Sequence, residues 1–334
     1  MSKRVIKFTT PPAVRYFSAV GGVEESLGPF GAKFDHVDTE GRFGQKTWED
    51  AEGEMARLCL NLALSKGGLS HGDLSVIVAG DLQNQCVASS TGLATFGVPY
   101  LGIYGACSTC TEGLLLLSLL LSQAGGIGAC VTSSHNCAAE RQFRTPVEYG
   151  GQRTPSAQWT ATAAGAFILD ATLPRYTAGV RVTEGMVGRI VDGGTTDGSN
   201  MGGAMAFAAA DSILTYFTES GREVRDFDFI VTGDLGRVGT AVLHDLLAER
   251  MPEVIPRHID CGNLIYDGRR DIHGGASGCG TSAAVLATHF LPMLTAGKIK
   301  SILLLSTGAL MSPSSVMQGH NILGIAPAVR IARE

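Results

Sequence analysis

Short apolar runs alternate along the chain with longer stretches in which apolar residues recur at helical spacing. The runs are rich in Val, Ile, Leu and Ala, as in strands that are buried on both faces. They are Val76–Ala79, Leu101–Ile103, Gly128–Thr132, Gly165–Leu169, Thr177–Val187, Phe229–Thr232 and Ser301–Leu305. The helical spacing predicts helices over residues 50–66, 88–96, 112–124, 206–217, 240–249 and 282–295. Strands that alternate with helices predict an α/β fold in which helices cover the faces of the sheets.

The chain contains the same set of motifs twice. The run VIVAGDL at residues 76–82 resembles FIVTGDL at residues 229–235. Gly105-Ala-Cys-Ser-Thr-Cys opens one apolar stretch, and Ala276-Ser-Gly-Cys-Gly-Thr-Ser-Ala opens another. Because the matches occur in the same order, they predict two duplicated halves with a Cys-bearing helix start in each. The expected halves are residues 1–190, with an irregular insertion at 137–161, and residues 191–334.

The composition supports a large core and excludes some classes of partner. Hydrophobic residues make up 45% of the 334 residues and charged residues 17%. The net charge is −5, and no Lys/Arg cluster has the density of a nucleic-acid-binding surface, so no nucleic-acid partner is expected. The first residues lack the apolar core of a signal peptide, and Leu114–Leu121 is too short to span a membrane. The scattered cysteines favour reduced thiols, so we expect a soluble protein on the cytoplasmic side.

Cys107 is the residue that most suggests chemistry. It follows a predicted strand and precedes a predicted helix, and Gly105 allows a tight turn before it. The positive end of a helix dipole favours the thiolate, which makes Cys107 a candidate nucleophile. Two alternatives stay open. Cys107 is a buried structural thiol, or it forms a redox pair with Cys110 in a CxxC motif at a strand–helix junction.

Several motifs resemble the thiolase and ketoacyl-synthase superfamily. Gly105-Ala-Cys-Ser-Thr before a buried helix resembles the nucleophile elbow of those enzymes. Met201-Gly-Gly-Ala-Met-Ala-Phe-Ala resembles a thiolase segment in which both prolines are replaced, and Gly280-Thr-Ser-Ala-Ala resembles a stretch of synthase III. The resemblance implies a thiolase fold, in which two duplicated βαβαβ-type halves form a layered αβαβα arrangement.

Longer runs resemble one branch of that superfamily, the stage V sporulation protein AD family. They are Tyr100-Leu-Gly-Ile-Tyr-Gly-Ala-Cys-Ser-Thr, Thr132-Ser-Ser-His-Asn, Ala139-Glu-Arg-Gln-Phe-Arg, Glu148-Tyr-Gly-Gly-Gln and Thr307-Gly-Ala-Leu-Met-Ser-Pro. The resemblance covers nearly the whole chain. It implies a non-catalytic protein that binds dipicolinic acid (pyridine-2,6-dicarboxylic acid). The family belongs to the spore machinery for uptake and release of this acid in sporulation and germination.

The residues that would support catalysis by Cys107 are missing from the sequence. Synthase III carries a His in a His-Gln-Ala-Asn run, whereas the corresponding stretch here, residues 232–236, contains no His. The synthase Asn falls at Gly280, and in an alternative alignment the thiolase His falls at Ile272, next to His273. A cysteine without a base and without oxyanion donors is a poor acyl-transfer catalyst. No catalytic residue is therefore assigned, although Cys107 resembles a nucleophile.

The cavity expected at Cys107 suits a small planar dianion. A helix N-terminus attracts carboxylates, and an arginine offers a forked donor for one. The candidate ligand-binding residues lie at predicted strand ends and helix starts or soon after them, and they are Cys107, Ser134, His135, Asn136, Arg141, Arg144, Asp234, Ser277, Cys279 and Thr307. No cofactor or metal is expected, because the Asp192–Asn200 loop does not match the EF-hand spacing.

Two rival functions are a Cys-dependent acyltransferase of the synthase III type, which acts on an acyl thioester, and a purely structural subunit of a multi-protein channel. The family resemblance implies dipicolinic acid as the partner, alone or as its calcium complex. It also implies membrane subunits of the spore channel complex as partners, and a peripheral place at the forespore or spore inner membrane. A homodimer is expected by analogy with the superfamily.

Overall fold

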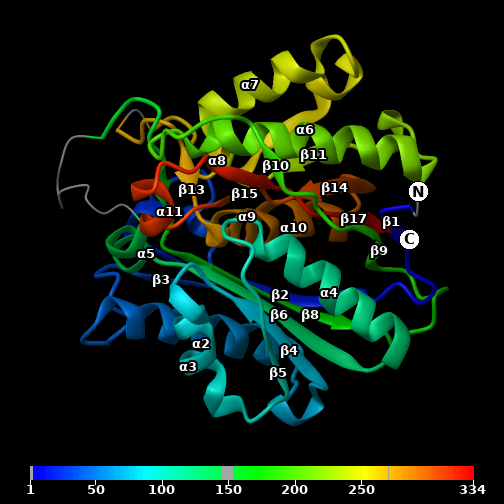
Figure 1. Ribbon diagram of the computed structural model, residues 1–334. Helices are drawn as coiled ribbons and strands as arrows, with labels where there is room; N and C mark the ends of the chain where they lie inside the picture. The colour runs from blue at the N-terminus through cyan, green and yellow to red at the C-terminus, as the bar shows by residue number, and fades with distance from the viewer. Residues whose placement is uncertain (1–2, 144–152, 270) are drawn as a thin grey trace.

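The computed structural model describes residues 3–143, 153–269 and 271–334, and its elements form five layers. From one outer face to the other, the layers are α6 (Met201–Ser220) with α7 (Gly236–Ala248), a sheet, α4 (Thr109–Ala124) with α9 (Cys279–Val285) and α10 (Leu291–Thr295), a second sheet, and α2 (Trp48–Lys66) with α3 (Val87–Leu93) (Figure 1). The predicted α/β class and the αβαβα layering are confirmed. Arg144 and the run that begins at Glu148 lie outside the described residues.

The two sheet layers are the two ends of one continuous sheet, and their strands are arranged in the same way counted from each edge. The order is β12 (His258–Asp260), β11 (Phe229–Thr232), β14 (Ser301–Leu305), β17 (Ala328–Arg333), β9 (Val180–Met186), β2 (Ala13–Gly22), β8 (Ala163–Asp170), β6 (Ile127–Ser134), β4 (Val76–Gly80) and β5 (Tyr100–Gly102). On each side, the three outer strands are parallel, and the next two pairings are antiparallel. The two sides join at β2 and β9 through the pair Ala13 and Arg181.

This symmetry places the repeated motifs at equivalent positions. β4 and β11 are both second from the edge, and Asp81 and Asp234 follow them at the same end. The predicted duplication of the halves is therefore confirmed. The boundary expected at residue 190 stays a prediction. β9 precedes this boundary, yet it pairs with β17 of the second half as well as with β1 and β2 of the first.

The central helix α4 forms because its sequence is apolar on nearly every side. Leu114, Leu117 and Leu121 are buried, and the helix packs between the two sheets. The stretch Ala106–Ala124 is long and apolar enough to cross a membrane by composition, but 67% of it is buried inside the protein. A helix that is apolar all round is the expected core helix of a large α/β protein. Gly113 allows close packing, because a Cβ there would lie 2.7 Å from the Sγ of Cys130.

The prediction from the sequence was wrong about one segment and missed one strand. The segment expected to be irregular from residue 137 begins as a helix, α5 (Asn136–Phe143), because Ala138 and Ala139 supply a small buried face. The long strand β2 was not predicted, because Arg15 and Tyr16 interrupt its apolar pattern. Arg15 forms an ion pair with Asp170 of the neighbouring strand β8 at 2.7 Å, so the charge is compensated inside the sheet.

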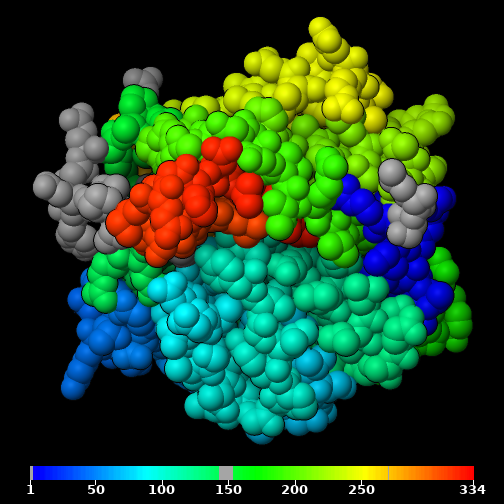
Figure 2. Space-filling view, in the orientation of Figure 1, coloured from blue at the N-terminus to red at the C-terminus, as the bar shows by residue number. Residues whose placement is uncertain are grey.

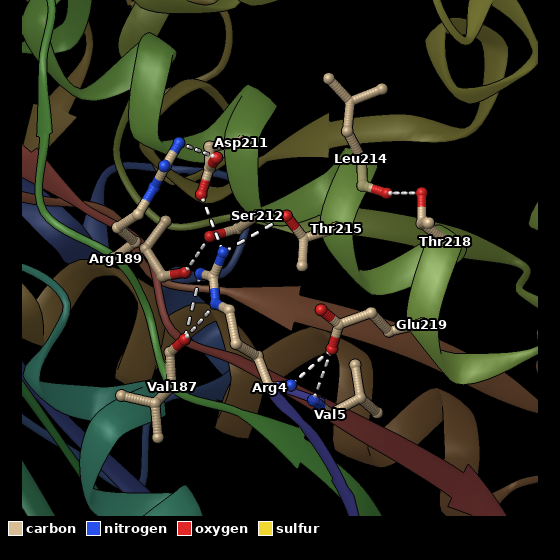
Figure 3. A network of polar contacts seen from close by, with 11 residues as sticks. Arg4, Val5, Val187, Arg189, Asp211, Ser212, Leu214, Thr215, Thr218 and Glu219 are labelled. Carbon is tan, nitrogen blue, oxygen red and sulfur yellow. Dashed lines mark hydrogen bonds and ion pairs between the residues drawn. The ribbon is translucent and has the colours of Figure 1, made fainter. Parts of the chain in front are cut away.

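The start of the chain is held by strand β9 and by helix α6 of the second half. Strand β1 (Val5–Lys7) pairs with β9, and Arg4 reaches helix α6 (Figure 3). Arg4 contacts Asp211 at 3.0 Å and donates to the carbonyl of Val187, while its backbone N–H donates to Glu219. Figure 2 shows the orange segment around α11 (Pro313–Met317) lying across this face between the green and cyan parts of the two halves.

Candidate functional site

The turn that carries Cys107 has a strained backbone. Ala106 adopts a left-handed conformation with φ of +51°, which is unfavourable for a residue with a Cβ atom. Two side chains hold the turn: Ser108 Oγ donates to the carbonyl of Gly105 at 2.7 Å, and Thr109 Oγ1 donates to that of Ala106 at 2.7 Å. A strained turn between a strand and a helix presents Cys107 at a fixed position at the start of α4.

The second half supplies an equivalent turn before α9. Gly278 has φ of +101°, a conformation that glycine adopts at little cost, and Cys279 opens the helix. Cys107 and Cys279 belong to one small buried cluster together with Leu82 and Ala139. The two Cys-bearing helix starts therefore meet in the interior, as the sequence repeat predicts.

The carboxylate of Asp234 is the central polar group of this site. Its Oδ2 accepts from the Gly278 N–H at 2.9 Å and from Ser277 Oγ at 3.3 Å, and its Oδ1 accepts from Thr307 Oγ1 at 2.9 Å. Burial raises the pKa of Asp234 to about 7. Ser277 Oγ also lies 3.7 Å from the Sγ of Cys107, so the hydroxyl connects the carboxylate and the thiol.

Cys107 is a neutral thiol in this environment. The residue is 6% exposed, and burial, followed by the charge of Asp234, raises the pKa of the Cys107 thiol well above its ordinary value. The expectation that the helix start favours a thiolate is therefore wrong, because desolvation and a nearby carboxylate outweigh the dipole. Cys110 is fully buried in the core of α4, which supports its interpretation as a core residue and not as a redox partner.

Other candidate residues lie around this centre without touching it directly. Ser134 Oγ accepts from the N–H of Gly280 at 3.2 Å, so it packs against the start of α9. His135 is buried, its ring lies tilted against that of Trp48, and its Nε2 contacts the carbonyl of Gly41 at 2.7 Å. Burial lowers the pKa of His135, so its ring stays neutral.

The predicted arginine contact is not formed by Arg141. Its guanidinium pairs with Glu49 at 2.6 Å, and its side chain is 55% exposed. Asn136 is also engaged elsewhere, since its Nδ2 donates to the carbonyl of Thr160 at 3.1 Å. Arg144, the other candidate, lies outside the described residues. The hydrogen bonds to the Asp234 carboxylate therefore come from two hydroxyls and a backbone N–H group.

The positions that the sequence aligned with the His and Asn of a synthase or thiolase bring neither side chain to Cys107. His273 is exposed, and Gly280 has no space for a side chain, because a Cβ there would lie 2.1 Å from the Ala163 carbonyl oxygen. Within residues 3–143, 153–269 and 271–334, no three His, Cys, Asp or Glu side chains converge as metal ligands.

Tyr104 is a site residue that the sequence analysis missed. The residue is 44% exposed, yet burial of its phenol, followed by the nearby Cys107 and Cys279 thiols, raises the pKa of Tyr104. Its position three residues before Cys107 was the available signal.

Two open grooves, of about 560 and 420 Å³, lie beside α6, and Cys107 lines neither of them.

The solved structures similar to this chain include two 3-oxoacyl synthases of type III. 3-Oxoacyl-[acyl-carrier-protein] synthase III from Aquifex aeolicus is 12% identical, with a TM-score of 0.59 over 96% of this chain and 99% of that one. 3-Oxoacyl-(acyl carrier protein) synthase III from Pseudomonas aeruginosa is 14% identical, with a TM-score of 0.59 over 96% and 98%. At this level of identity the likeness shows a common thiolase-like fold and nothing about activity.

Sequence comparison is more specific. The model of the family described as stage V sporulation protein AD matches residues 2–332. Stage V sporulation protein AD of Bacillus subtilis is 38% identical over 334 residues, which cover 99% of this chain and 97% of that protein. This chain therefore belongs to the stage V sporulation protein AD family, built on a thiolase-like fold.

Proposed function

We propose that this protein binds dipicolinic acid in the spore machinery for its uptake and release, and that it does not catalyse acyl transfer. The observation that carries the proposal is a neutral, buried Cys107 that Ser277 connects to the carboxylate of Asp234. A thiol with a raised pKa is a poor nucleophile. The membership of a sporulation family supports the same conclusion.

The chemistry of the site fits a small planar acid. Hydroxyls of Ser277 and Thr307 and the N–H of Gly278 already donate to one carboxylate, that of Asp234, so a ligand carboxylate that enters here shares donors suited to its oxygens. The start of the long helix α4 adds a positive dipole end at Cys107. Tyr104 offers an aromatic face at the outer side, against which a pyridine ring can stack.

Calorimetry with dipicolinic acid, with acetyl-CoA titrated in parallel, tests this function. We expect binding of dipicolinic acid only, and weaker binding of the monocarboxylate picolinic acid, because one set of donors then lacks a partner. Cys107→Trp should abolish binding by filling the site. Unchanged affinity in that variant would remove the site from the proposal.

The contribution of arginine is tested by a matched pair of variants. Arg141→Ala should leave the affinity unchanged, because this guanidinium already pairs with Glu49. Arg144→Ala should weaken binding by about tenfold or more if Arg144 holds a carboxylate of the ligand, the effect of one lost charge-assisted hydrogen bond. Equal affinities in both variants would leave hydroxyls and N–H groups as the donors.

A Cys-dependent acyltransferase is the second candidate, favoured by the strained turn at Ala106 and by the synthase fold. It requires turnover of an acyl-CoA that disappears in Cys107→Ala.

The proposal that the protein binds dipicolinic acid includes two further partners. They are the membrane subunits of the spore channel at the inner membrane and the calcium complex of dipicolinic acid. Co-purification with those subunits and titration with calcium test them.

A further inference from the structure

We propose that Asp234 determines the specificity of this site and takes up a proton when an aromatic dicarboxylate binds. This inference rests on the proposed function and adds a mechanism of discrimination to it. Asp234 is fully buried and accepts hydrogen bonds from Gly278, Ser277 and Thr307. All three donors are electrically neutral, so an ionised Asp234 keeps its full negative charge in the site.

The groups packed around Asp234 from other elements provide no compensating cation in the described part of the chain. Cys107 at the start of α4, Cys279 of α9 and Cys261 of α8 (Cys261–Leu264) are thiols that stay neutral, because burial raises the pKa of each. The other carboxylate is Asp260 at the end of β12, and its charge also raises the pKa of Asp234.

Asp260 is less suited than Asp234 to take the proton. Its two oxygens accept from four donors: the N–H groups of Leu235, Gly236 and Asn263 and the hydroxyl of Thr232, at distances between 2.7 and 3.0 Å. Protonation would displace one of these donors and loosen the turn that follows Asp234. The pKa of Asp234, about 7, is consistent with Asp234 as the group that titrates in the neutral range.

A dianion placed beside Cys107 meets the Asp234 carboxylate at short range. Two like charges in a desolvated site repel strongly, and a proton on one of them removes the repulsion. A protonated Asp234 also becomes an O–H donor, so it holds the ligand carboxylate where an ionised Asp234 rejects it. The proton comes from solvent, and no covalent bond of the ligand changes.

Calorimetric titration of the full chain with dipicolinic acid tests the proton uptake directly. The titrations are run without divalent cations, between about pH 6 and about pH 9, in two buffers with different ionisation enthalpies. Above about pH 7 we expect close to one proton taken up and affinity that falls about tenfold per pH unit. Asp234→Asn should bind without proton uptake and with a nearly flat pH profile.

Glu25→Gln is the matched control. Glu25 is also fully buried, burial also raises its pKa to about 7, and it lies at Tyr266 and Thr162 rather than at Cys107. It should retain the proton uptake of the unmodified protein. Proton uptake by the unmodified protein is measured from its binding enthalpy in the two buffers and needs no variant. Poor folding of Asp234→Asn would therefore not block the test.

The outcomes separate this inference from the proposed function. Binding of dipicolinic acid without proton uptake overturns the role of Asp234 and leaves the function standing. Proton uptake that persists in Asp234→Asn also overturns it. Absence of binding at every pH removes the proposed function, and with it this inference.

Discussion

At the scale of single residues, the two aspartates that end equivalent strands have different surroundings. Asp81 gives both its oxygens to its own half: Oδ1 accepts from the Gln83 N–H, and Oδ2 from Ser89. Asp234 also bonds within its own half, but to the later turn that carries Ser277 and Gly278. The two aspartates therefore differ in reach: the partners of Asp81 lie within 8 residues of it, whereas Ser277 lies 43 residues beyond Asp234.

Glu25 gives a prediction on stability against pH. Its Oε1 accepts from Tyr266 and from the N–H of Thr162 at 3.0 Å, and its Oε2 is buried. Burial raises the pKa of Glu25 from 4.5 to about 7, so the folded protein holds a proton that the unfolded chain releases. The stabilising contribution is present below pH 4.5 and is lost as pH rises through about 7.

The comparison with Glu25→Gln measures this contribution. Between about pH 5 and about pH 8, the stability of the unmodified protein should fall relative to the variant by up to about 3 kcal/mol. Urea unfolding at both pH values gives the two free energies. A difference between the proteins that does not change with pH would contradict the prediction.

Gly280 gives a prediction about the missing synthase asparagine. A Cβ at this position would lie 2.1 Å from the Ala163 carbonyl oxygen and 2.7 Å from Ser134 Oγ. Gly280→Asn should therefore lower the free energy of unfolding by about 3 kcal/mol or more, and should not create acyl transfer. Gly179→Asn is the control, because a Cβ there meets no atom within 4 Å. Equal stability of the two variants would contradict the prediction, because it would mean that the backbone moves to accommodate a side chain at residue 280.

The site residues that could be predicted are those whose signal comes from their neighbours in the sequence. Cys107 was found because its signal is local: a small-residue turn between a strand and a helix. The pairing of Arg141 with Glu49 and the contact of Asp234 with Gly278 join distant parts of the chain. No periodicity in the sequence reports such contacts.

At the scale of elements, apolar runs identified most strands, but two strands that contain charged residues, β2 and β17, were missed. β17 contains Arg330, and β2 contains Arg15. β9 was predicted although it contains Arg181, which donates to the Pro11 carbonyl at 2.8 Å inside the protein. A buried arginine that is satisfied by carbonyl oxygens breaks the apolar pattern of a strand without breaking the strand. The helices were predicted well because helical spacing extends over several turns.

The start of helix α2 gives a prediction at this scale. Thr47 Oγ1 accepts from the N–H of Asp50 at 3.1 Å, which satisfies one free donor of the first turn. Thr47→Ala should lower the free energy of unfolding by about 1 kcal/mol. Thr218→Ala should be close to neutral, because this exposed hydroxyl only donates back to the Leu214 carbonyl within α6. Urea unfolding that ranks the two variants in the opposite order would refute the role of the cap.

At the scale of the whole molecule, strand β5 leaves a sheet edge uncovered. Tyr100, Leu101 and Tyr104 are each between 39% and 44% exposed on or beside it, and no charged side chain of the strand protects it. Exposed apolar edge strands pair readily with other strands. We propose that a second copy of the chain covers this edge and forms a homodimer.

Leu101→Glu should convert that dimer into a monomer, as measured by light scattering after size-exclusion chromatography. The charge would have to be buried between the two copies. Leu27→Glu, at an exposed apolar residue far from β5 in the chain, should keep the dimer. A monomeric unmodified protein would exclude the interface.

The position of β17 has a consequence for how the chain is made. This strand follows all the others in sequence, yet it lies inside the sheet between β14 and β9. Until residues 328–333 have left the ribosome and paired, the side of β9 that receives β17 is open to strands of other chains. The strands β2, β8, β6, β4 and β5 are all available much earlier. We therefore expect chaperones to be needed mainly by the later part of the chain, until β17 pairs with β9.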